Sequence, residues 1–197
     1  MSILTPPQRP RVWNLPNQLT ASRFVLALVL FALIAAESWL WCLVVFIVAA
    51  FTDWLDGYLA RKQNLMSTLG RLLDPLVDKV LMCGVYICLL PIGVQQGWLR
   101  PWMVTVVVGR ELVITGLRSW MEAHGARFGA DWLGKFKMGL QCAAVIAVFV
   151  AFLAPETASS VSAFFAWVRD VLIWSMTVAT LLSGLQYIWK AAMLLSA

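Results

Sequence analysis

Four of the chain's six aspartates lie close together, between residues 53 and 78. An α-helix turns by about 100° per residue, so Asp53 and Asp56 share one helix face, and Asp74 and Asp78 share a face of a second helix. A short polar segment separates the two pairs, so we expect the two faces to meet. The spacing therefore predicts four carboxylates around one small volume.

Carboxylates without histidine or cysteine nearby favour a hard cation such as Mg²⁺ or Mn²⁺. Two such ions, held by shared carboxylates, clamp a phosphoryl group and stabilise charge on its attacking and leaving oxygens. A carboxylate that the metal does not fully use can accept a proton from an alcohol nucleophile. The aspartate cluster thus predicts two-metal phosphoryl transfer.

A second set of charged residues follows in two later apolar stretches. Glu111 and Arg118 are seven residues apart, so they share one helix face. Arginine binds phosphate in bidentate fashion, and lysine binds it as a point charge. We expect Arg118 and Lys135 to form a phosphate pocket beside the metal site, with Arg110 and Lys137 as further members.

Both sets also have a purely structural interpretation, as ion pairs and lipid-headgroup anchors. In that interpretation the aspartates pair with Arg61, Arg71 and Lys79, Arg110 pairs with Glu111, Arg118 pairs with Glu122, and Lys135 and Lys137 contact lipid. A third alternative is a cation transporter. Its ion path needs polar residues across the bilayer, whereas residues 80–90 are nearly all apolar.

The composition indicates the environment in which these side chains work. Apolar residues make up 61% of the 197 residues and charged residues only 13%, whereas soluble domains have about 45–50% and about 25%. The mean hydropathy is +0.82, and there are 11 tryptophans. Too few polar side chains remain to coat a soluble surface, so we predict a polytopic integral membrane protein.

Apolar stretches recur at lengths that cross a hydrocarbon core, which takes about 20 helical residues. Backbone groups must be paired inside the bilayer, so the predicted fold class is all-α, with six transmembrane helices. The expected spans are residues 19–36, 39–60, 74–92, 102–121, 132–153 and 165–189. We expect residues 1–18 to form an N-terminal arm with an interfacial segment, and residues 19–197 to form the catalytic transmembrane domain.

The first apolar stretch has a rival interpretation as a signal peptide, because arginines precede it. Five more apolar stretches and the aspartates follow, so we predict a retained helix. The connections that would be cytoplasmic carry most of the basic residues, and positive charge marks the inside. We therefore expect a multi-pass protein of the inner (cytoplasmic) membrane, with both termini and the active site cytoplasmic.

The net charge of +5 fits cytoplasmic loops and anionic membrane lipids. A basic ribbon with interleaved aromatic residues and a nucleic-acid-binding motif are both missing from the sequence. We therefore expect membrane lipids, and no nucleic acid, among the partners.

The aspartates and their neighbours form the pattern D-x2-D-G-x2-A-R-x8-G-x3-D-x3-D. At every fixed position it resembles the signature of the CDP-alcohol phosphatidyltransferase family. The resemblance implies that Asp53 and Asp74 bridge two ions and that Asp56 binds one of them. It implies that Asp78 binds the other ion and is the general base.

The resemblance also implies a lipid donor, CDP-diacylglycerol, whose diacylglycerol-bearing phosphate is attacked by an alcohol while CMP leaves. Residues that match the family's donor-binding positions fall into two stretches. They are Asn17 and Thr20 near the donor's phosphates, Gly57, Arg61 and Ser67 in contact with CDP, and Ala60 and Gly70 where room is needed. The family also implies a homodimer.

The acceptor is indicated by two further stretches, VGRELVITGLRSWMEAHG from residue 108 and WLGKFKMGLQ from residue 132. They resemble phosphatidylglycerophosphate synthases, whose acceptor is sn-glycerol 3-phosphate. The expected products are phosphatidylglycerol phosphate and CMP, in phospholipid biosynthesis. The same chemistry with inositol phosphate, phosphatidylglycerol or serine as acceptor is the nearest alternative.

Overall fold

A computed structural model describes the backbone of residues 15–63, 68–123, 132–154 and 159–195. Side-chain surroundings are described for residues 18, 20–52, 76–121, 134–154 and 160–193. Within these ranges the fold is all-helical, which confirms the predicted class. The described backbone forms six helices, α1 Leu15–Ala35, α2 Trp39–Gln63, α3 Thr68–Gln96, α4 Pro101–Ala123, α5 Trp132–Leu153 and α6 Ser159–Leu195.

The helix ends carry local signals. Glu37 has φ 54° between α1 and α2, and Ser38 follows it as a residue type that is favoured before a helix start. Gly97 has φ +81° directly after α3, a left-handed conformation that glycine adopts without steric cost. Pro101 then begins α4, where its missing N–H costs no helical hydrogen bond.

Most helix boundaries differ from the expected spans by a few residues, and α1 and α3 begin at Leu15 and Thr68 rather than at residues 19 and 74. The expected third span ended at residue 92, directly after Pro91, but α3 continues to Gln96. A proline removes one helical hydrogen bond, and membrane helices tolerate this loss. Helix α6 begins at Ser159 rather than at residue 165 and ends at Leu195 rather than at residue 189. Polar residues at its start lie on the helix rather than in a connection.

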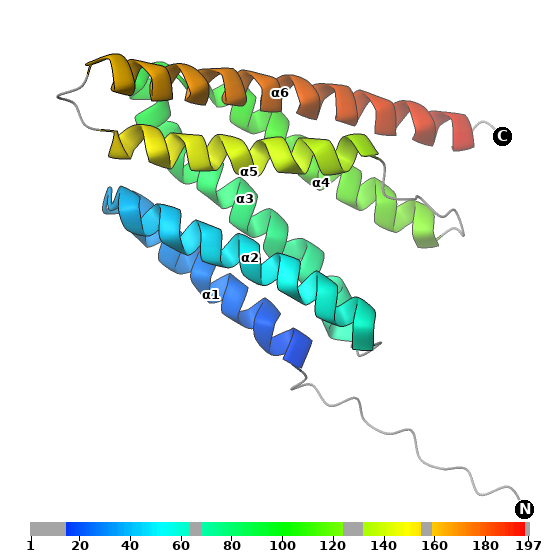
Figure 1. Cartoon of the computed structure of the whole chain (residues 1–197). Coiled ribbons are helices and arrows are strands. Elements are labelled where there is room, and N and C mark those ends of the chain that lie inside the picture. The colour runs from blue at the N-terminus through cyan, green and yellow to red at the C-terminus, as the bar shows by residue number, and fades with distance from the viewer. Residues whose placement is uncertain (1–14, 64–67, 124–131, 155–158, 196–197) are drawn as a thin grey trace, which may run out of the picture.

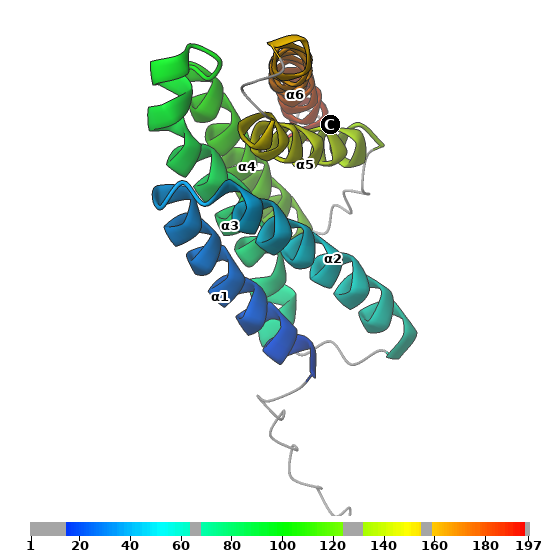
Figure 2. The same ribbon diagram turned by 60° about the vertical axis from the view of Figure 1, so that its left-hand side comes forward.

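The helices alternate in direction, so that the C-terminal end of α2 and the N-terminal ends of α3 and α5 lie toward one side of the molecule (Figures 1 and 2). Helix α1 packs on both α2 and α3, and α5 packs on α2, α3 and α6. Between the described residues of α2 and α3 there is no direct packing. The space between these two helices is therefore bordered by α1 and α5.

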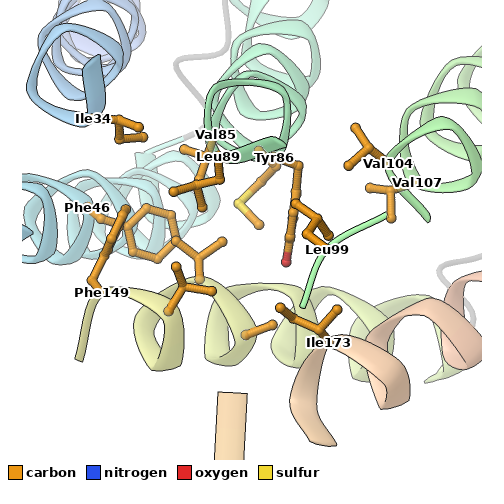
Figure 3. Close-up of a cluster of buried hydrophobic side chains, with 14 of the residues drawn as sticks. Ile34, Phe46, Val85, Tyr86, Leu89, Leu99, Val104, Val107, Phe149 and Ile173 are labelled. Atoms are coloured by element: carbon orange, nitrogen blue, oxygen red, sulfur yellow. The ribbon is translucent and has the colours of Figure 1, made fainter. Parts of the chain in front are cut away.

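The apolar core takes residues from all six helices. Phe46 of α2 packs edge-to-face on Phe149 of α5, with ring centroids 6.2 Å apart, and Ile173 of α6 is fully buried in the same cluster (Figure 3). The hydroxyl of Tyr86 donates a 2.9 Å hydrogen bond to the backbone carbonyl of Gln141, which ties α3 to α5 inside this core.

Among the residues whose side chains are described, three helices contain segments that are long and apolar enough to cross a membrane. These segments are Leu76–Gln96, Gly134–Leu153 and Ser160–Met193, and shorter apolar segments occupy Thr20–Ala35 and Trp39–Thr52. Many large apolar side chains face outward, Leu112, Leu185 and Trp189 among the most exposed. Such a surface suits lipid and not water.

One glycine allows α1 and α3 to approach. A methyl group at Gly84 would lie 2.1 Å from the ring of Phe31, so Gly84→Ala is expected to destabilise the protein by about 1–3 kcal/mol through overpacking. Gly116 of α4 has open space around it. Gly116→Ala is the matched control, and we expect it to leave stability unchanged or to raise it by about 0.5–1 kcal/mol. Apparent melting temperatures in detergent test both; equal shifts would contradict the close approach.

Candidate active site

Asp78, near the start of α3, forms an ion pair with an arginine from α1. The Arg23 Nη1 donates a hydrogen bond of 2.6 Å to the Asp78 Oδ1. The Arg23 side chain is only 2% exposed, whereas that of Asp78 is 25% exposed. The arginine is thus the more buried partner, and the carboxylate is the more accessible member of the pair.

A cavity of about 330 Å³ lies among α1, α2, α3 and α5. Arg23, Asp78 and Lys135 supply its charged groups, and most of its wall is apolar. The apolar lining comes from Phe46, Ala49, Ala50, Leu81, Met82, Met138, Gly139 and Cys142. This composition suits a ligand with a charged portion and a hydrocarbon portion. We call it the amphiphilic cavity.

A second cavity of about 200 Å³ lies among α3, α4 and α5. Six of its nine lining residues are charged or polar, and we call it the polar cavity. The lining comprises Asp78, Lys79, Met82, Arg110, Glu111, Gly134, Lys137, Met138 and Gln141. Asp78, Met82 and Met138 line both cavities, so the carboxylate of Asp78 lies at their shared wall.

Glu111 joins α4 to α5 at the polar cavity, and its neighbour Arg110 extends the connection to α6. Its Oε1 accepts a bond from the Nζ of Lys137 on α5 and lies 3.2 Å from the Nη1 of Arg110. The Nη2 of Arg110 in turn donates a 2.7 Å bond to the Ser183 Oγ on α6, and its guanidinium lies 5.5 Å from the ring centre of Tyr187. The pairing of Arg110 with Glu111, one of the structural alternatives, is therefore present.

The polar cavity has an excess of positive charge around it. Arg118 lies close enough for its charge to act on both Lys79 and Arg110, and Lys137 lies within reach of the same two residues. The described acidic side chains that line this cavity are Asp78 and Glu111, which are fewer than the cations. The arrangement favours an anionic ligand.

The structure distributes the four expected phosphate-binding residues differently from the sequence prediction. Arg110 and Lys137 line the polar cavity, whereas Lys135 lines the amphiphilic cavity on the other side of Asp78. Arg118 lines neither of these two cavities. The partner Glu122 lies outside the described side chains, so the Arg118–Glu122 alternative stays a prediction.

Most of the predicted donor and metal site lies outside the described side chains. The backbone places Asp53 and Asp56 in the last turns of α2, and Asp74 in the first turns of α3. The side chains of Asn17, Gly57, Ala60, Arg61 and Gly70 are not described, and Ser67 lies between the described segments. Thr20 of α1 is described and is 3% exposed.

The donor set can still be tested for its fit to a metal. All four aspartates offer carboxylate oxygens, the donors that Mg²⁺ and Mn²⁺ prefer. The helix ends that carry them are joined by only four residues, 64–67, so the two pairs begin on the same side of the molecule (Figure 1). Among the described side chains no group of three or more potential metal ligands occurs, because three of the four aspartates lie outside that set.

Sequence reasoning did not select Arg23 or Ser183 as site residues. Arg23 could have been selected from the sequence, because it is the single ionisable residue of α1, and ionisable residues in membrane helices are usually functional or paired. Ser183 carried no comparable signal, since serines often lie in membrane helices without a charged partner. Its bond to Arg110 spans 73 residues of sequence.

Comparison with known proteins adds independent findings. The model of the CDP-alcohol phosphatidyltransferase family matches residues 13–182. A CDP-diacylglycerol–glycerol-3-phosphate 3-phosphatidyltransferase of Bacillus subtilis (strain 168) is 34% identical over 194 residues, which cover 91% of this chain and 95% of that protein. The enzyme of the same name from Yersinia enterocolitica is 31% identical, over 90% of this chain and 96% of its own.

A CMP-forming cardiolipin synthase of rice (Oryza sativa subsp. japonica) is also similar, at 32% identity over 71% of this chain and 46% of that protein. The family match extends over helices α1 to α5 and into α6, and it contains every residue that lines the two cavities. From this coverage, this chain belongs to the CDP-alcohol phosphatidyltransferase family.

Proposed function

We propose that this protein transfers the phosphatidyl group of CDP-diacylglycerol to sn-glycerol 3-phosphate, giving phosphatidylglycerol phosphate and CMP. The names of the Bacillus and Yersinia relatives, which match nine tenths of the chain, support this reaction. It makes the protein a transferase of phospholipid biosynthesis.

The observation that carries the proposal is the position of Asp78 between two unlike cavities. The reaction joins a lipid donor to a small phosphorylated alcohol, so it needs one cavity with apolar walls and another with cationic walls. The amphiphilic cavity fits the first requirement and the polar cavity the second. A carboxylate at their shared wall is in reach of both reacting groups.

We assign the role of general base to Asp78. An oxygen of the acceptor hydroxyl attacks the diacylglycerol-bearing phosphorus, the bond from this phosphorus to the CMP oxygen breaks, and the hydroxyl proton passes to a carboxylate oxygen of Asp78. Lys137 and Arg110 would hold the acceptor's phosphate, together with Arg118 and Lys135. By holding both substrates in a reactive geometry, the helices would supply a large part of the rate gain.

Two divalent ions, Mg²⁺ or Mn²⁺, complete the proposed site. Asp53, Asp56, Asp74 and Asp78 would hold them, since their donor chemistry fits, and the ions would stabilise charge on the attacking and leaving oxygens. Residues that would bind the CDP-diacylglycerol donor are Asn17, Thr20, Gly57, Ala60, Arg61, Ser67 and Gly70. These assignments rest on the family resemblance.

We further propose that all six helices cross the membrane, with both termini and the active site on the cytoplasmic side. The three long apolar segments support a membrane location. The basic residues in and beside the connections between α2 and α3 and between α4 and α5 support the orientation. The alternating helix directions are consistent with this topology (Figure 1). A homodimer is the oligomeric state that the family implies.

The acceptor is tested by competition in detergent or nanodiscs. We expect the lipid product to have the mass of phosphatidylglycerol phosphate, and CMP release to follow glycerol 3-phosphate and to ignore serine. A product with the mass of cardiolipin, formed from phosphatidylglycerol, would instead support the reaction named for the rice relative. A phosphatidylinositol phosphate product would also move the acceptor while leaving the chemistry intact.

A further inference from the structure

Arg23 is a buried cation that neither the family pattern nor the reaction assigns. It is the single ionisable residue of α1, and the whole residue is 1% exposed. A charge so deep in a largely apolar helix is costly unless a partner compensates it. Its partner is Asp78, the carboxylate to which the proposed reaction gives the proton transfer.

The geometry of the pair determines what Arg23 can do. The 2.6 Å bond from Nη1 holds one oxygen of the carboxylate, Oδ1. The terminal torsion of an aspartate is soft, so a carboxylate at a cavity wall would otherwise sample many orientations. A charge-assisted bond from a planar, buried guanidinium restricts this rotation.

We propose that Arg23 is a positioning residue, which fixes the orientation of the Asp78 carboxylate toward the two cavities. The inference rests on the proposed function, because it needs Asp78 to act in the transfer. Arg23 and Asp78 both line the amphiphilic cavity, and only Asp78 also lines the polar cavity. Arg23 therefore contacts the carboxylate from the wall of the amphiphilic cavity, and it does not line the polar cavity, where Arg110 and Lys137 lie.

A merely structural salt bridge would also tie α1 to α3, so the test must separate the two roles. A misplacement of about 1 Å at a reacting group costs about 100-fold in rate, whereas loss of a structural contact lowers stability. Arg23→Gln removes the charge, and Arg23→Lys keeps it with a single compact donor. Tyr86→Phe is the matched control, because it removes another buried bond, to Gln141, between α3 and a neighbouring helix.

The experiment measures kcat and KM for both substrates, the dissociation constant for CDP-diacylglycerol and the apparent melting temperature of the purified full-length variants. We expect Arg23→Gln to lower kcat about 100-fold while both KM values and donor binding change less than about threefold. Arg23→Lys should recover about tenfold of this loss. Tyr86→Phe should lower the melting temperature and leave kcat within about twofold.

Three results would overturn the inference. An unchanged kcat with weaker donor binding would make Arg23 a donor-phosphate ligand. Equal loss in the Lys and Gln variants, in step with the melting temperature, would make the pair purely structural. If Arg23→Gln does not fold, wild-type kcat in the Lys variant would refute a positioning role. Absence of CMP release from wild-type protein with every alcohol is a distinct result, and overturns the proposed function itself.

Discussion

Asp78→Asn is expected to lower CMP release by about 10²–10⁴-fold, the usual contribution of a positioned general base. The amide has nearly the volume of the carboxylate, so the cavities keep their shape, but it no longer accepts the acceptor's hydroxyl proton. CDP-diacylglycerol binding should persist in part, because the remaining donor-binding residues are unchanged. Turnover in detergent and donor binding by titration measure the two effects separately.

Asp170→Asn is the matched control for this variant. Asp170 also pairs with an arginine, Arg169, at 2.9 Å, but on α6 and with its side chain 47% exposed. An exposed pair contributes only about 0–1 kcal/mol, so this variant should keep normal turnover. Near-normal turnover in Asp78→Asn would refute the assignment of the base.

Glu111→Ala is expected to destabilise the protein by about 3–5 kcal/mol, which corresponds to roughly 6–20 °C in melting temperature for a chain of this size. The carboxylate accepts bonds from both Lys137 and Arg110, and Glu111 is 9% exposed. Its removal leaves two cations without their shared anion in a poorly solvated place. Thermal unfolding in detergent measures the effect.

A double variant separates charge from packing at the same position. Glu111→Gln combined with Lys137→Met removes one charge of each sign, and we expect it to be markedly more stable than Glu111→Ala, because replacing a whole buried pair costs little. Glu37→Gln, on an exposed residue between α1 and α2, should shift stability by less than about 0.5 kcal/mol. Equal losses in Glu37→Gln and Glu111→Ala would contradict the network.

The helices were predictable because apolar length and backbone pairing dictate them. The starts of α2 and α5 agree with the expected spans, at Trp39 and Trp132. Some boundaries differ because a helix continues through residues that often end one, as α3 continues past Pro91 to Gln96. Polar residues such as Ser159 begin α6 early because a helix can carry them near its end.

The site was predictable in its chemistry and less so in its connections. The pair of Arg110 and Glu111 joins neighbours in the sequence, and it was among the structural alternatives that the sequence offered. The pair of Arg23 and Asp78 spans 55 residues and depends on how α1 packs against α3. The separation of Lys135 from Lys137 into different cavities likewise follows from the orientation of α5, because residues two apart point in different directions on a helix.

The central claim is most directly tested by CMP release from purified protein with CDP-diacylglycerol and Mg²⁺, measured with and without glycerol 3-phosphate. We predict strong stimulation by glycerol 3-phosphate, which chelation of the metal and the variant Asp74→Ala both abolish. Metal-dependent release without that stimulation would contradict the acceptor. Failure to release CMP with any alcohol would contradict the account of the site as a whole.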